Sequence, residues 1–251
     1  MHIRSLSLSA VALLLAIFAW GSAAQALTVY PNYVGTNVTF TSIQESSTFG
    51  DPEPLFGAPI GFADQLLFFP ASFSASAAGA GGFDQTGAQL QAMVTSNNPG
   101  TYAIEKVNLS EFGDANLSGV GTNATGTFAG LSGFVTVLEV GGVAVAPTVI
   151  PFVGIFAPGD TLDLITNPGV TIWSGSATID VASVVANATK VQLSIDNNLF
   201  AFSEAGTGAL IQKKVVDGPA IIVDIVPEPG TFALLGAGLL GLATRARSRR
   251  R

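Results

Sequence analysis

Cysteine is absent from this chain of 251 residues, and its single histidine is His2. Without cysteine there is no disulfide framework, no thiol nucleophile and no cysteine-ligated metal. With histidine confined to the start, the rest of the chain cannot form a Ser-His-Asp triad or a zinc site of the common histidine type. We therefore expect a protein that is not an enzyme and that holds neither a metal nor a cofactor.

Basic residues are also scarce over residues 27–225, where four lysines stand against 16 acidic residues and the net charge is −12. A surface this acidic repels the phosphate backbone of nucleic acid, which is therefore not an expected partner. The same charge helps to keep an exported protein soluble.

The N-terminus has the three parts of a secretory signal peptide. Two basic side chains come first, an apolar run follows over residues 10–20, and small residues, Ala24 and Ala26, occupy the two positions that signal peptidase reads. We assign residues 1–26 to a Sec signal peptide that is cleaved before Leu27. A permanent N-terminal anchor is the alternative, but the apolar run is short for a membrane span.

Residues 27–225 predict a mainly β domain. Short stretches of alternating apolar and polar residues recur, such as Val191-Gln192-Leu193-Ser194-Ile195, and glycine and proline bound them. This period of two is typical of strands with one buried face. It predicts an antiparallel β-sandwich, jelly-roll-like or an incomplete barrel, rather than a parallel α/β fold. Residues 71–82 are rich in alanine, serine and glycine, and we expect them to form a mobile loop.

Local sequence signals place some turns within this domain. Gly141-Gly142 lies between two apolar runs and is expected to close a hairpin. Asn-Pro-Gly occurs at residues 98–100 and 167–169, which predicts two type II turns. The apolar alternation changes phase between Ile104 and Val107, and one extra residue there predicts a β-bulge.

Residues 226–251 contain three parts in a fixed order: a Pro-Glu-Pro turn, an apolar run of 12 residues and a cluster of five arginines. As a helix the run would cover about 18 Å, against about 30 Å for the hydrocarbon core of a bilayer, so it predicts a short membrane helix that inserts transiently. The arginines would hold the end in the cytoplasm. The residues of the three parts are Pro227, Glu228 and Pro229; Phe232, Leu234, Leu235, Leu239, Leu240 and Leu242; and Arg245, Arg247, Arg249, Arg250 and Arg251.

This order resembles the PEP-CTERM sorting signal of bacterial envelope proteins. The resemblance implies that the chain is a substrate of exosortase, a membrane cysteine transpeptidase, and that Pro227, Glu228 and Pro229 are the recognition element. It also implies a Gram-negative envelope, often one that makes exopolysaccharide. Two prolines keep such a segment extended. A second copy, Pro52-Glu53-Pro54, has neither the apolar run nor the arginines after it, so we expect it to be a loop.

Three functions are open for such a chain. The first is an exported protein of the cell envelope or extracellular matrix, with a non-enzymatic structural or adhesive body and a final place at the cell surface or outside the cell. The second is a carbohydrate-binding module with the same routing, which binds exopolysaccharide through Trp173 and surface aromatic residues, although a core position suits Trp173 better. The third is a GPI-anchored surface protein, but such tails end in apolar residues rather than arginines.

Other polar groups carry weaker signals. Asp160 with Asp163, and the run Asp196-Asn197-Asn198, offer oxygen ligands for calcium but lack a recognised spacing. Glu105 and Glu111 have the residue type of a glycosidase pair, yet among 16 acidic residues such pairs arise by chance. We therefore expect no metal or catalytic site among these residues.

Overall fold

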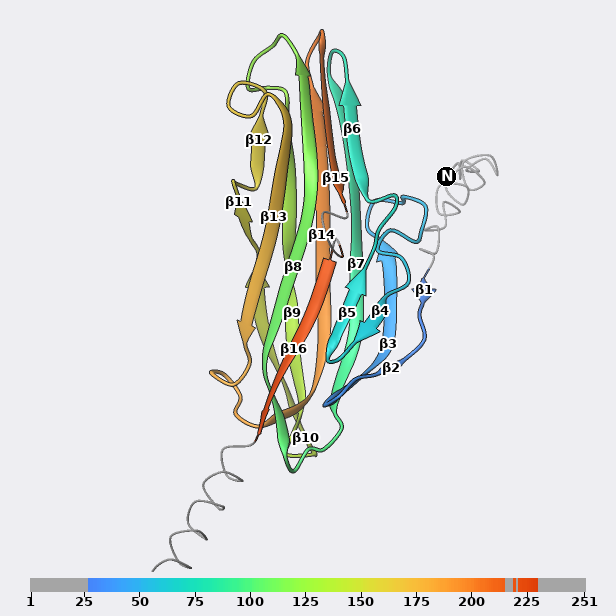
Figure 1. Cartoon of the computed structure of the whole chain (residues 1–251), viewed down its shortest axis with the longest axis vertical. Coiled ribbons are helices and arrows are strands. Elements are labelled where there is room, and N and C mark those ends of the chain that lie inside the picture. The colour runs from blue at the N-terminus through green and yellow to red at the C-terminus, as the bar shows by residue number, and fades with distance from the viewer. Residues whose placement is uncertain (1–26, 215–218, 220, 230–251) are drawn as a thin grey trace, which may run out of the picture.

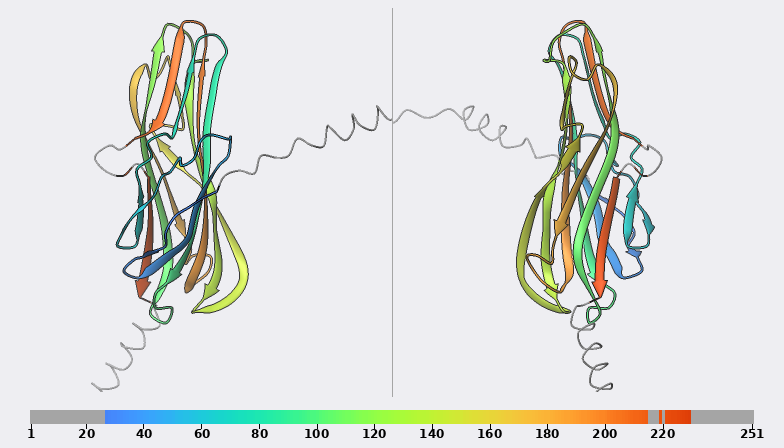
Figure 2. Two further views of the ribbon diagram at one scale, coloured as in Figure 1. Left: turned by 90° about the vertical axis from the view of Figure 1, so that its right-hand side faces the viewer. Right: turned by 60° about the vertical axis from the view of Figure 1, so that its left-hand side comes forward.

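The computed structural model describes residues 27–214, 219 and 221–229. Within them every regular element is a β-strand, and the strands pair antiparallel. Two sheets pack face to face in an elongated sandwich, which confirms the predicted fold (Figures 1 and 2). No helix in this part of the chain has the length and apolar character needed to cross a membrane. The predicted signal peptide, membrane segment and arginine cluster lie outside the described residues.

We call the sheet that contains the first strand sheet A. Its strands in spatial order are β1 (Thr28–Val29), β3 (Val38–Ser47), β7 (Gly82–Ser96), β14 (Ala188–Ser203), β9 (Gly126–Val140) and β10 (Val143–Val153). Two short strands pair outside this order, β2 (Tyr33–Val34) with β3 and β12 (Thr161–Asp163) with β9. The long strands β7, β14 and β9 therefore form the centre of the sheet.

Sheet B contains the strand that carries the Pro-Glu-Pro sequence. Its strands in spatial order are β11 (Ile155–Ala157), β13 (Gly169–Asp180), β8 (Tyr102–Gly119), β16 (Ile221–Pro229), β5 (Gln65–Phe68) and β4 (Ile60–Phe62). A further strand, β15 (Thr207–Lys213), pairs with β8 and with β6 (Ser74–Ala78). Because β8 is so long, β15 and β16 pair with different halves of it.

The alternating sequence pattern explains which side chains fill the core. Along β14, Val191, Leu193 and Ile195 are buried between the sheets, while the intervening residues are half-buried on the outer face. Val38 and Phe40 of β3 are fully buried in the same way. Each such side chain contributes about 1.5–3 kcal/mol on burial, so the core alone accounts for a large stabilising term without any disulfide.

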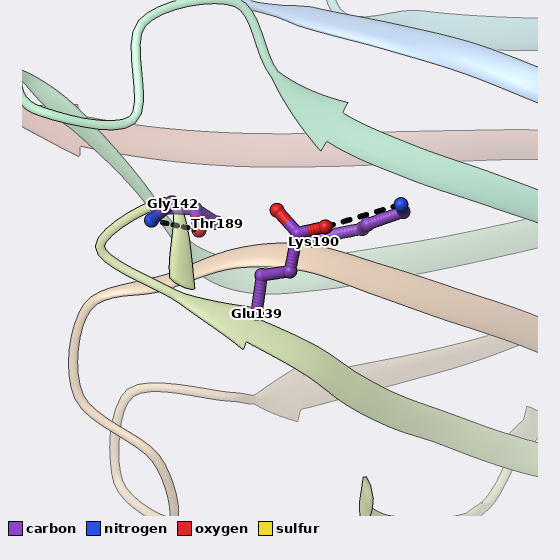
Figure 3. Close-up of polar contacts among 4 residues, drawn as sticks. All are labelled: Glu139, Gly142, Thr189 and Lys190. Atoms are coloured by element: carbon purple, nitrogen blue, oxygen red, sulfur yellow. Dashed lines mark hydrogen bonds and ion pairs between the residues drawn. The ribbon is translucent and has the colours of Figure 1, made fainter. Parts of the chain in front are cut away.

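The predicted hairpin at Gly141-Gly142 is confirmed. The two glycines have φ of +56° and +79° and join β9 to β10, as in a two-residue turn of the left-handed type. The turn is fixed to β14, because Gly142 N–H donates to Thr189 Oγ1 at 2.9 Å and Lys190 Nζ lies 3.1 Å from Glu139 Oε1 (Figure 3). This end of the sandwich is therefore tied together by strands from distant parts of the sequence.

Two local predictions are wrong. Residues 71–82 do not form a loop throughout, because β6 lies within them and pairs with β15. Ala75 and Ala77 are buried in that strand, and small side chains suit a place where the two sheets come close. Of the two Asn-Pro-Gly turns, Gly169 has the predicted positive φ, +80°, whereas Gly100 does not, and Asn98 O instead accepts two N–H groups, from residues 101 and 102.

Candidate sorting site and the outer face of sheet A

The Pro-Glu-Pro sequence forms the end of β16, at one end of the sandwich (Figure 1). Its backbone pairs with the first residues of β8, with Pro227, Glu228 and Pro229 opposite residues 104, 103 and 102. On the other side of β16, pairing with β5 extends only from Ile221 to Asp224. The N–H of Ile225 donates to Asp64 O at 3.1 Å, so among the described strands β8 alone pairs with residues 226–229.

A β-bulge lies where the sorting sequence begins. The register between β16 and β8 shifts between Val226 and Pro227, and Glu105 of β8 is the extra residue. This confirms the bulge predicted between Ile104 and Val107. Proline cannot donate to a strand ladder and is tolerated at bulges and edges, so the irregular pairing suits this sequence. The carbonyl of Glu105 accepts N–H groups from residues 181 and 182, at 2.9 and 3.1 Å, which fixes the bulge in place.

The internal copy, Pro52-Glu53-Pro54, is a loop as predicted. Glu53 Oε1 accepts the N–H of Ser47 at 2.7 Å, and Oε2 accepts the hydroxyl of Thr28 at 2.8 Å. The carboxylate of this copy therefore serves the fold, because it ties the loop to strands β1 and β3.

The outer face of sheet A carries a ladder of side-chain amides across three strands. Gln44 of β3 donates to Gln91 of β7 at 3.1 Å, Gln91 donates to Gln89 at 2.5 Å, and Gln89 donates to Asp196 of β14 at 2.9 Å. Each amide has both a donor and an acceptor, so the ladder retains hydrogen-bonding capacity toward solvent. No local pattern in the sequence predicts this ladder, because it forms only once the strands are in register.

Four phenylalanine rings gather on the same face, farther along β14. Phe200 lies at their centre, with ring centroids 5.9 Å from Phe49, 6.3 Å from Phe83 and 5.8 Å from Phe128. The Phe83 side chain is 61% exposed and that of Phe49 is 40% exposed. Phe200 and Asp196 share one face of β14, because residues separated by an even number point the same way. The amide ladder and this phenylalanine cluster therefore lie on the same outer face of sheet A.

The other sequence-predicted residues are dispersed. Trp173 is 1% exposed and packs against Phe156 at 6.2 Å, so it belongs to the core and offers no sugar-stacking face. Asn197 points into the core while Asp196 lies on the outer face, so the run that contains them cannot bind one calcium ion through both side chains. Across residues 27–214 and 221–229, no three acidic or histidine side chains gather as a metal site would require.

Asp163 acts as a turn cap. Its Oδ1 accepts the N–H groups of Ile165 and Thr166, each at 2.9 Å. These hydrogen bonds, first of all the one from Thr166, hold the pKa of Asp163 below its usual value. The Asp163 side chain therefore serves to stabilise the turn that follows β12.

The architecture is that of an all-β sandwich whose last described strand ends in Pro-Glu-Pro. Residues 226–250 match the family model of the PEP-CTERM protein-sorting motif. The chain therefore carries a PEP-CTERM sorting signal, which supports export to the cell envelope or surface. A search of curated proteins gives no match.

Two solved structures show a remote likeness to this chain. The carbohydrate-binding module TmCBM61, in complex with β-1,4-galactotriose, matches over 81% of this chain and 90% of its own, with 7% identity and a TM-score of 0.21. A structure of infectious bursal disease virus, strain Gx, matches over 68% of this chain and 43% of its own, with 13% identity and a TM-score of 0.20.

Proposed function

We propose that this chain is an exported protein of the cell envelope or extracellular matrix, and that exosortase sorts and processes it through residues 226–251. The match of residues 226–250 to the PEP-CTERM motif carries the proposal. The body is then a structural or adhesive β-sandwich without catalytic activity of its own, and the transpeptidase supplies the chemistry. Signal peptidase acts at the other end of the chain.

The position of the motif supports this role. An enzyme that cuts a peptide chain binds it in an extended form, and β16 already holds Val226 to Pro229 extended. These residues lie at one end of the sandwich and have one described neighbouring strand (Figure 1). They can therefore separate from the sheet without opening the core, because strand ends open locally at much lower free energy than the whole domain.

The test uses the same substitution in the two Pro-Glu-Pro sequences. Full-length Glu228→Gln and Glu53→Gln variants are produced in a host that has exosortase, and the intact mass of the exported protein is measured. The wild type and Glu53→Gln should begin at Leu27 and lack the arginine cluster, whereas Glu228→Gln should retain it. Deleting exosortase gives the decisive control, because equal loss of the tail without the enzyme would refute the proposal.

A second candidate function is supported by the outer face of sheet A. Sugars are bound by planar side-chain amides and carboxylates together with exposed aromatic rings, and this face has both. Under this reading the body binds exopolysaccharide with the amide ladder and the phenylalanine cluster, rather than with Trp173.

A matched pair of variants tests this second function. Phe83 on sheet A is 61% exposed, and Phe62 on β4 of sheet B is 65% exposed. On a glycan array, Phe83→Ala should weaken binding and Phe62→Ala should not. Absence of binding by the wild type to any polysaccharide, or equal loss in both variants, would exclude this face as a sugar site.

A further inference from the structure

A lysine and a glutamate meet inside the sandwich, away from both candidate sites. Lys213 ends β15 and Glu111 lies on β8, and Nζ lies 2.5 Å from Oε2. The side chains are 0% and 2% exposed, so solvent does not reach the pair. The backbone of Lys213 is fixed as well, because its N–H donates to Phe73 O at 2.9 Å.

Aromatic rings enclose the amine. Nζ of Lys213 lies 5.2 Å from the centroid of the Phe73 ring and 5.3 Å from that of Trp173. Two glycines leave room for the enclosed groups. A Cβ at Gly175 would come within 2.9 Å of Glu111 Cγ, and one at Gly113 would overlap the Trp173 ring. The surrounding strands are thus shaped around this pair.

As a plain ion pair, this arrangement is poorly satisfied. Glu111 Oε1 and the indole N–H of Trp173 are buried, and within the described residues neither has a hydrogen-bond partner. A buried ion pair stabilises a fold only where its remaining hydrogen-bonding groups are also met. Burial raises the pKa of Glu111 and lowers the pKa of Lys213, so the enclosed site disfavours the charged form of each group.

We propose that Lys213 and Glu111 condense to form an intramolecular amide bond that links β15 to β8. The neutral amine of Lys213 attacks Cδ of Glu111, so that an Nζ–Cδ bond forms and the Cδ–Oε2 bond breaks. Oε2 leaves as water, with the carboxyl proton and one proton from Nζ. No oxidant, metal or second molecule is needed. Exclusion of solvent favours the amide, because the reverse reaction requires water.

The linked residues are 102 apart in the sequence. A covalent bond across so long a loop restricts the unfolded chain, as a disulfide does. Because the chain has no cysteine, it cannot form a disulfide. The amide would therefore be a covalent cross-link of another kind. It would also connect the strand before residues 215–218 to the centre of sheet B.

Intact mass spectrometry of the purified, denatured full-length protein tests the proposal. The wild type should be lighter by one water than the sequence between its measured termini requires, and a branched peptide should join Lys213 to Glu111. Lys213→Arg should have the full mass. Lys214→Arg is the matched control, because the half-exposed side chain of Lys214 pairs with Asp114 at 2.9 Å. The mass of the Lys214→Arg variant should still be lower by one water.

Two results would overturn the proposal. One is a wild-type mass equal to that of its sequence, which needs no variant and so does not depend on whether Lys213→Arg folds. The other is loss of ammonia instead of water, with a branch from Lys213 to Asn197. Asn197 is fully buried on the facing sheet, and within the described chain its amide has no partner. That branch would make Glu111 a proton carrier rather than the acceptor.

Discussion

The buried carboxylate of Glu45 holds the segment that carries Leu55 and Phe56 against β3, so Glu45→Ala should destabilise the fold strongly. Oε1 accepts the N–H of Leu55 at 2.6 Å, and Oε2 accepts the N–H of Phe56 at 2.9 Å. Glu45 is 1% exposed, so both donors lose their partner away from solvent. Each such group costs about 1–3 kcal/mol, and the free energy of unfolding should fall by about 2–6 kcal/mol.

Glu139→Ala provides the control for this prediction. Glu139 pairs with Lys190 at 3.1 Å, but both side chains are partly exposed, so the loss should stay below about 1 kcal/mol. Urea unfolding of each variant, followed by circular dichroism, gives both values. If the two variants lose the same stability, the cost of unpaired buried N–H groups is not what makes Glu45 important, and the reasoning fails.

The pH dependence of the Glu45 variant gives a second test. Burial raises the pKa of Glu45, and the hydrogen bonds from Leu55 and Phe56 only partly offset this. The folded state therefore binds this proton more tightly than the unfolded state, whose pKa is about 4.3. The contribution is fully present below that value and is lost as the pH rises through the folded pKa. The difference in stability between the wild type and Glu45→Ala should thus widen as the pH falls.

Two further variants test the close packing and the turn. Gly113→Ala should lower the free energy of unfolding by about 3 kcal/mol or more and change the fluorescence of Trp173, because the added Cβ would overlap the indole ring and the backbone oxygen of Gln212. An unchanged emission spectrum would contradict this. Gly141→Ala should lower the free energy of unfolding in urea by about 1–2 kcal/mol, because φ of +56° strains any residue with a Cβ. A variant as stable as the wild type would show that the turn adopts another form.

Features that depend on a few adjacent residues could be predicted from the sequence. The alternation of Val191, Leu193 and Ile195 identifies a half-buried strand, because the period of two is a property of the strand itself. The Gly141-Gly142 turn and the bulge at Glu105 are also local, since each follows from the conformations that neighbouring residues allow. The Pro-Glu-Pro sequence is recognisable for the same reason, because its signal lies in the order of nearby residues.

Features that depend on pairing between distant strands could not be predicted. Residues 71–82 have a loop-like composition, yet β6 forms because β15 provides a partner for it. The amide ladder requires β3, β7 and β14 to be in one particular register, which composition does not reveal. The pair of Lys213 with Glu111 requires the register of β15 on β8 and the burial that follows from it. Strand register is set by the whole sheet rather than by any one segment.

Pairing of the sorting sequence with β8 has a consequence for processing. An enzyme must separate Val226–Pro229 from β8 before it can bind both sides of their backbone. Each backbone hydrogen bond that holds such a segment contributes only about 0.5–1.5 kcal/mol, so the segment opens at much lower free energy than the whole domain. A disulfide between Lys106→Cys and Val226→Cys, which lie opposite each other, would block that opening. Because the chain has no other cysteine, no competing disulfide can form within it.

Processing by exosortase-containing membranes should therefore be slower by about tenfold or more for the oxidised double variant, a factor that corresponds to only about 1.4 kcal/mol. Reduction should restore the wild-type rate, which shows that the substitutions themselves are tolerated. Cysteines at Thr136 and Gln192, which pair on sheet A, make the matched control, and oxidation there should change nothing. Equal rates in the oxidised and reduced forms of the first variant would mean that the enzyme reads the sequence while Val226 stays paired. Opening would then begin only after Val226, at the bulge formed by Glu105.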